Sequence, residues 1–260
     1  MKKIKPIEEL EFSDDFMFNQ VMQNDEICIE VLERLLKIKI DHIERVDLEK
    51  AIKPYYNSKS IRVDVYVKDS NQIFDIEMQA INRENLPRRL RYYQSMVDAN
   101  ALVKGQDYSE LNETYILFIC KSDPLGKNFP IYTFLETCQE EKSILLNDGS
   151  HKYFFNADAA DNEKDVDIRN FLNYIKSGTA DDELTNKIEA IVDDVKNNEA
   201  VKELYMYESL YMRDHLKEAK EEKAIEDAVI LVKEFNISPE LAAQKLEAPL
   251  DKVLEVLEAK

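Results

Sequence analysis

The stretch IRVDVYVKDSNQIFDIEMQ, residues 61–79, decides the fold. Residues 61–68 alternate apolar and polar side chains, and residues 73–80 do the same. A period of two is typical of a β-strand, because successive strand side chains point to opposite faces of a sheet. Between the two runs lies Asp-Ser-Asn-Gln, residues 69–72, which is typical turn chemistry. The stretch therefore predicts a β-hairpin.

A loop that is symmetric about residues 70 and 71 fixes the register of this hairpin. The predicted opposed pairs are Asp64 with Glu77, Arg62 with Gln79, and Tyr66 with Asp75. Directly opposed residues have Cβ atoms about 4.5–5.5 Å apart, and like charges at that distance destabilise a sheet. A divalent cation bound by the carboxylate oxygens of Asp64 and Glu77 would offset this repulsion.

The same alternation separates the acids from the apolar side chains. Val63, Val65 and Val67 lie on the face opposite Asp64 and Glu77. We expect this valine face to pack on the core, with the acids in a cleft. A solvated polar face without a site is the other interpretation, and a shift of one residue in the register would separate the two acids.

The remaining chain predicts further helices and strands. Residues 12–38 carry helical periodicity with a break near Asn24, and another helix follows Pro87. Strand-like runs follow at 114–120, 131–135 and 152–156. This order indicates an α+β fold, or an α/β fold with a mixed sheet.

From about Val166 the sequence is helical and highly charged. We expect a core over residues 1–160 and a helical C-terminal region over residues 161–260, which ends in a small three-helix tail at about 224–260. The tail has a helix-turn-helix-like pattern, which would suit a DNA reader. Its helices are not basic, however, and this favours packing or oligomerisation.

Composition excludes several classes of function. The chain has 260 residues, a net charge of -18 and only four glycines, and it contains no glycine-rich phosphate loop. Its acidity repels nucleic acid on average, so any nucleic-acid surface must be local. The three scattered histidines and three cysteines show no zinc-site spacing. With no CxxC pair, no apolar leader and no long apolar run, the sequence favours reduced thiols and a cytoplasmic location without membrane association.

Residues 83–104 concentrate basic side chains in this acidic chain. The stretch holds five bases and two acids, a net charge of +3. Helical spacing places Arg88 beside Tyr92 and Arg89 beside Tyr93, which joins guanidinium groups to aromatic rings. The stretch therefore predicts phosphate contacts, although a solvated or salt-bridged helix face would have the same composition.

Several segments together resemble a known family. Asp64, followed thirteen residues later by Glu77-Met78-Gln79, resembles the PD-(D/E)XK nuclease signature with glutamine in place of lysine. The longer segments DFMF (15–18), FDIEMQ (74–79) and LPRRLRYYQS (86–95) resemble the Rpn recombination-promoting nucleases, also called PD-(D/E)XK nuclease family transposases. The resemblance covers residues 12–215.

This resemblance implies a restriction-endonuclease-like core and hydrolysis of DNA phosphodiester bonds with Mg²⁺ or Mn²⁺. By the family's pattern, the carboxylates of Asp64 and Glu77 and the backbone carbonyl of Met78 would bind the metal, and Gln79 would take the third catalytic position. Asp15 matches the family's acid in the first helix. It would contact the metal site indirectly, or act only as a helix cap. The resemblance also implies a place for Arg89 and Tyr93 at the edge of the cleft, where they would bind substrate or orient the acids.

Gln79 departs from the family signature in a way that affects chemistry. A neutral amide can orient a water molecule, but it supplies no full positive charge. Arg62, opposite Gln79 in the predicted register, is a candidate replacement, and an arginine that only balances the charge of the acids structurally is the alternative. Two functions therefore remain open: a metal-dependent DNA endonuclease, or a nuclease-fold protein with little or no catalysis that binds nucleic acid or protein. Cleavage of both DNA strands would require two sites, which suggests a homodimer.

Overall fold

A computed structural model of the chain describes residues 4–40, 42–52, 60–69, 71–81 and 84–258. The chain divides into two compact units, Lys5–Asn198 and a C-terminal unit that begins at Glu199. The first unit continues well past residue 160, where the sequence predicts the end of the core. The division therefore falls later than expected.

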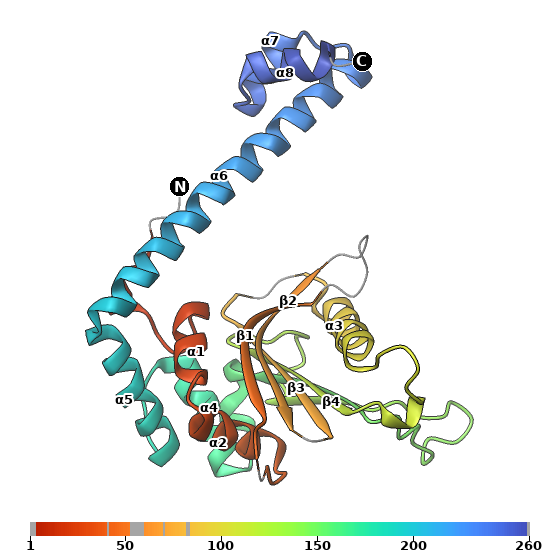
Figure 1. The fold of residues 1–260 in the computed structure, drawn as a ribbon, viewed down its shortest axis with the longest axis vertical. Coiled ribbons are helices and arrows are strands. Elements are labelled where there is room, and N and C mark those ends of the chain that lie inside the picture. Colours follow the sequence, from red (N-terminus) through yellow and green to blue (C-terminus); the bar gives the residue numbers. More distant parts are fainter. Residues whose placement is uncertain (1–3, 41, 53–59, 70, 82–83, 259–260) are drawn as a thin grey trace. The chain divides into compact units, whose positions relative to one another are not determined.

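The described strands of the first unit form a six-stranded mixed sheet (Figure 1). Its strands are β1 (Arg45–Ile52), β2 (Ile61–Asp69), β3 (Gln72–Gln79), β4 (Glu113–Cys120), β5 (Ile131–Phe134) and β6 (Ser150–Asn156), in the order β1-β2-β3-β4-β6-β5. Strands β3, β4 and β6 are parallel, and β1, β2 and β5 pair antiparallel with their neighbours. The predicted α+β class with a mixed sheet is confirmed.

The β2–β3 pairing confirms the predicted hairpin register. Val65 pairs with Ile76 and Tyr66 with Asp75, and the ladder continues to the turn at Asp69 and Gln72. Strand β1 is missing from the sequence prediction. It pairs with β2 from Arg45–Lys68 to Ile52–Ile61, so β2 is not an edge strand.

Helices cover both faces of the sheet (Figure 1). One face carries α3, and the other carries the remaining long helices of this unit. The helices are α1 (Asp15–Met22), α2 (Asp25–Leu36), α3 (Leu86–Ala101), α4 (Val166–Ser177) and α5 (Glu183–Asn197). Asn24 caps α2 by accepting a hydrogen bond from the Ile27 amide at 3.1 Å, which explains the predicted break.

Strand β3 is buried along both of its faces. Every residue from Ile73 to Gln79 is buried, including the side chains of Asp75 and Glu77. The α3 residues Leu90 and Tyr93 pack with Phe118 of the neighbouring strand β4 on this side of the sheet. Of the two acids expected in a cleft, Glu77 is buried beneath α3, whereas Asp64 is half-buried.

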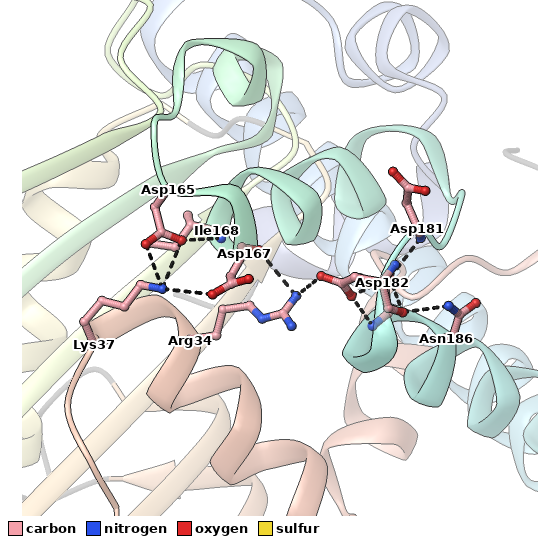
Figure 2. A network of polar contacts seen from close by, with 9 residues as sticks. Arg34, Lys37, Asp165, Asp167, Ile168, Asp181, Asp182 and Asn186 are labelled. Atoms are coloured by element: carbon pink, nitrogen blue, oxygen red, sulfur yellow. Dashed lines mark hydrogen bonds and ion pairs between the residues drawn. The ribbon is translucent and has the colours of Figure 1, made fainter.

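Ion pairs attach α4 and α5 to α2 (Figure 2). Arg34 Nη1 lies 2.5 Å from Asp182 Oδ2, and Lys37 Nζ lies 2.9 Å from Asp165. Each acid also caps a helix: Asp165 accepts from the Ile168 amide in α4, and Asp182 accepts from an amide of α5. These contacts explain why the first unit extends beyond residue 160.

The C-terminal unit contains α6 (Glu199–Phe235), α7 (Pro239–Leu246) and α8 (Leu250–Glu258). Its small core joins the end of α6 to the other two helices through Val229, Ala242 and Val253. Ser238 caps α7 with Pro239 in the first turn, as the Ser-Pro sequence suggests. In the part of the chain that the structure describes, no helix combines the length and apolar character needed to cross a membrane.

Candidate functional site

Two backbone-to-side-chain hydrogen bonds connect Asp64 with the Glu77–Met78 segment. Glu77 Oε1 accepts from the backbone N–H of Asp64 at 3.0 Å, and Asp64 Oδ2 accepts from the backbone N–H of Met78 at 3.1 Å. The β2–β3 ladder ends at the preceding pair, Val65 and Ile76. Beyond this pair, the backbone N–H groups donate to side-chain oxygens instead of to the carbonyls of the opposite strand. These hydrogen bonds hold the two carboxylates beside each other.

Arg89 from α3 closes the site. Its Nη2 lies 2.5 Å from Glu77 Oε2, and its Nη1 donates to Gln79 Oε1 at 3.0 Å. Gln79 Nε2 in turn donates to the Met78 carbonyl at 2.9 Å. The cation that contacts Gln79 is therefore Arg89, which the sequence predicts at the edge of the site but without this contact.

Tyr93 holds Arg89 from the next turn of α3. Arg89 Nη2 donates to Tyr93 Oη at 2.8 Å, and the Tyr93 hydroxyl donates to the Arg62 carbonyl at 3.1 Å. The predicted shared helix face of Arg89 and Tyr93 is present. Arg62 has an exposed side chain and lies beyond the β2–β3 ladder, so the predicted Arg62–Gln79 ladder pair does not form.

Asp75 adds a third acid. Its side chain is fully buried, and neither carboxylate oxygen accepts a hydrogen bond from the described residues. Burial, together with the charge of Asp64, raises the pKa of Asp75 well above its usual range. Burial and the charges of Asp75 and Asp64 do the same to the pKa of Glu77, which Arg89 opposes. The Arg89 guanidinium thus compensates part of the negative charge at Asp75 and Glu77.

The donor chemistry of this cluster fits a hard divalent cation. Carboxylate and carbonyl oxygens are the ligands that Mg²⁺ and Mn²⁺ prefer, and both oxygens of the buried Asp75 lack a hydrogen-bond partner among the described residues. Within the described ranges, no group of three or more His, Cys, Asp or Glu side chains is arranged to hold a metal. The predicted ligands would therefore be two carboxylates, Asp64 and Glu77, with the Met78 carbonyl.

The other predicted residues lie around this cluster. Arg88 is exposed and Tyr92 is half-buried, both on α3. Asp15 is the first residue of α1, and Asp14 occupies the cap position, so the helix-cap role proposed for Asp15 is wrong. Arg83 of the basic stretch lies outside the described residues.

A comparison with protein families decides the chain's relationship. The model of the family described as PD-(D/E)XK nuclease family transposase matches residues 13–234. The chain belongs to this family. No curated protein and no solved structure matches this chain. The PD-(D/E)XK family match includes all the residues of the acid cluster and all of α3.

Membership of the PD-(D/E)XK family agrees with the mixed sheet and with the acids on neighbouring strands. Sequence reasoning identified Asp64, Glu77 and Gln79 as site residues, but it gave no role to Asp75. The strand alternation already places Asp75 on the same face as Glu77. That signal could have singled it out.

Proposed function

We propose that the chain is a metal-dependent DNA endonuclease. The observation that carries this proposal is the pair of hydrogen bonds, from the Asp64 amide to Glu77 and from the Met78 amide to Asp64, that holds Asp64 beside Glu77, near a buried Asp75 that accepts no hydrogen bond from the described residues. Concentrated carboxylates in a family of nucleases favour a metal centre over a structural role, because buried like charges destabilise a fold that has no cation to offset them.

The metal ligands in this proposal are Asp64, Glu77 and the Met78 carbonyl. When bound, Mg²⁺ or Mn²⁺ would acidify water and withdraw charge from the phosphate. Hydrolysis forms a bond between the water oxygen and phosphorus and breaks the bond from phosphorus to one ester oxygen. That oxygen leaves and gains a proton, while the attacking water loses one.

DNA would approach along α3, where the local charge is opposite to that of the whole chain. Arg88 is exposed there, and we assign it a contact with the DNA backbone. Tyr92 lies one turn further along α3 and would contact the sugar or base beside that phosphate. We assign Asp15 an indirect role, through water, near the metal.

A binding module without efficient catalysis is the second candidate. The observation that favours it is that the expected metal ligands already have partners: Glu77 accepts from Arg89, and the Met78 carbonyl accepts from Gln79. Metal binding would require these contacts to rearrange.

Cleavage of supercoiled plasmid discriminates between the two candidates. The wild type is compared with Glu77→Gln in Mg²⁺, in Mn²⁺ and in chelator, with both proteins purified identically. Glutamine keeps the shape of the side chain but removes the charge that holds the metal. Glu255→Gln, on an exposed position of α8, is the control for the loss of one carboxylate.

The endonuclease proposal predicts metal-dependent nicking or linearisation by the wild type and by Glu255→Gln, and its loss in Glu77→Gln. Equal cleavage by all three proteins would identify a contaminating nuclease. Folded wild type that leaves the plasmid intact in either metal would contradict the endonuclease and support the binding module.

A further inference from the structure

Arg89 is held in place from three sides. It donates to Glu77 and Gln79 of β3 and to Tyr93 of its own helix. The guanidinium also lies 4.8 Å from the Tyr93 ring centroid and 5.4 Å from that of Phe118, so aromatic faces flank it. An arginine fixed in this way is preorganised, because little side-chain freedom remains to be lost on binding.

Arg89 also links the buried acids to solvent. Its side chain is 23% exposed, whereas that of Glu77 is 0% exposed. Of its five N–H groups, Nε–H and the second N–H on Nη1 donate to none of the described residues. Donors therefore remain for a ligand that reaches the site from solvent.

The charge of Arg89 is suited to an anion at this position. Both Asp75 and Glu77 feel its field, and an arginine guanidinium remains protonated in proteins. An approaching phosphate is repelled by the acids. It therefore needs a fixed cation on the protein side as well as any metal.

We propose that Arg89 is the residue that binds the scissile phosphate and stabilises the charge that develops on it, and that Gln79 is a positioning residue for Arg89. This inference rests on the proposed nuclease function. Arg89 transfers no proton. Its N–H donors stabilise the non-bridging phosphate oxygens while the water oxygen bonds to phosphorus and the ester oxygen leaves.

The hydrogen bonds of Gln79 give a physical reason for glutamine at this position. Its Nε2 is used by the Met78 carbonyl, which turns Oε1 toward Arg89. A lysine at residue 79 has no acceptor and would repel the guanidinium. Because Arg89 of α3 supplies the cation, residue 79 of β3 must supply a hydrogen-bond acceptor for it.

The test removes the positive charge of Arg89 and then restores a positive charge from a neighbouring position. The variants are Arg89→Gln, Arg89→Lys and the double variant Gln79→Lys/Arg89→Gln, which restores a positive charge from β3. The control is Lys164→Gln, which removes an exposed positive charge elsewhere in the same unit. Because loss of Arg89 leaves Glu77 buried without its cation, each protein is first checked for folding by circular dichroism, and Arg89→Lys keeps the charge if Arg89→Gln unfolds.

Cleavage at saturating DNA is the first readout. We expect Arg89→Gln to lower kcat by about 100-fold or more, and Arg89→Lys to lose less. The double variant should regain at least about tenfold over Arg89→Gln. A purely structural Arg89 would give no such rescue, and equal kcat in the single and double variants would overturn the inference.

Salt dependence of DNA affinity is the second readout, and it does not require cleavage. Fluorescence anisotropy with a labelled duplex in Ca²⁺ should show that Arg89→Gln lowers the slope of log affinity against log salt by about 0.9, whereas Arg89→Lys and Lys164→Gln leave it unchanged. If the wild type binds without cutting and the slope falls, the phosphate contact stands and the nuclease proposal fails. An unchanged slope in a cutting enzyme overturns the inference alone, and a wild type that neither binds nor cuts overturns both.

Discussion

Asp75 is the acid of the site whose buried carboxylate accepts no hydrogen bond from the described residues. Burial without a hydrogen-bond partner disfavours the charged form of Asp75, because the loss of its hydration is not replaced, and this raises its pKa. Arg89 contacts Glu77 rather than Asp75 through its guanidinium nitrogens. The metal-free fold therefore carries a local instability, which is consistent with a site built to accept positive charge.

We predict that Asp75→Asn stabilises the metal-free protein. Asparagine has the same shape without the charge, so the free energy of unfolding in chelator should rise by about 1 kcal/mol. Thermal unfolding measures this change, with the exposed Asp194→Asn on α5 as the control. A lower unfolding temperature in Asp75→Asn than in the control would contradict the account of this residue.

The sequence predicts the acid pair at residue scale because alternation and a symmetric turn fix a hairpin register locally. Asp64 and Glu77 come together through contacts within nineteen residues of chain. Arg89 reaches the same cluster from a helix that crosses the sheet. The periodicity of the strands and of the helix does not determine where the helix crosses the sheet. The contact between Arg89 and Gln79 therefore cannot be predicted from these local patterns.

At the scale of elements, the helix caps and ion pairs of Figure 2 decide where the first unit ends. Asp182 both caps α5, through the Thr185 amide at 2.9 Å, and pairs with Arg34 of α2. The Asp182 carboxylate thus both caps α5 and connects this helix to α2, which is distant in the sequence. The hydrogen bonds from Thr185 and Arg34 lower the pKa of Asp182 despite its burial.

We predict that Asp182→Ala destabilises the chain by about 2 kcal/mol, since it removes a cap and leaves Arg34 without this partner. Chemical denaturation at pH 7 measures the loss. The neighbouring Asp181→Ala is the matched control, because its exposed side chain lies beside the same helix start. Equal destabilisation by both variants would show that the Asp182 contacts contribute nothing specific.

The pH dependence of this contribution follows from the lowered pKa of Asp182. A carboxyl whose folded-state pKa lies below its unfolded value, about 3.9, stabilises the fold above that value. The stabilisation is lost as the pH falls through the folded-state pKa. The difference in stability between wild type and Asp182→Ala should be full at pH 6–7 and shrink below about pH 4. A difference that grows on acidification would contradict this sign.

Most elements follow from periodicity and turn chemistry, and the exceptions have physical causes. Residues 45–52 alternate in part, but Lys50 interrupts the apolar positions, so β1 was not predicted. Strand β3 has a polar pattern on one face and is nevertheless buried there. Its burial depends on α3 covering the sheet, which is a tertiary effect that a local pattern does not contain.

At the scale of the whole molecule, the chain contains two units with separate cores. In α6, the residues from Met206 to Lys223 are largely exposed, whereas the buried positions of this helix, such as Ile225 and Ala228, belong to the C-terminal core. A helical segment that lies outside the core of its own unit receives little stabilisation from that core.

We predict that limited trypsin digestion cuts first between Arg213 and Lys223, because this segment opens without disturbing either core. Mass spectrometry of the early fragments identifies the site. The exposed Arg88 on α3 is the internal comparison, since that helix packs on the sheet. Cleavage at Arg88 as fast as within α6 would contradict the assignment of α6 as the least protected helix.

The central claim is that Asp64 and Glu77 together hold a divalent metal. Calorimetric titration of Mn²⁺ tests it most directly, with wild type, Asp64→Asn, Glu77→Gln and the exposed control Glu255→Gln at one pH. The account predicts saturable binding by wild type and Glu255→Gln, and affinity at least about tenfold weaker in each of the other two. Equal affinity in all four proteins, or no binding by the wild type, would contradict it.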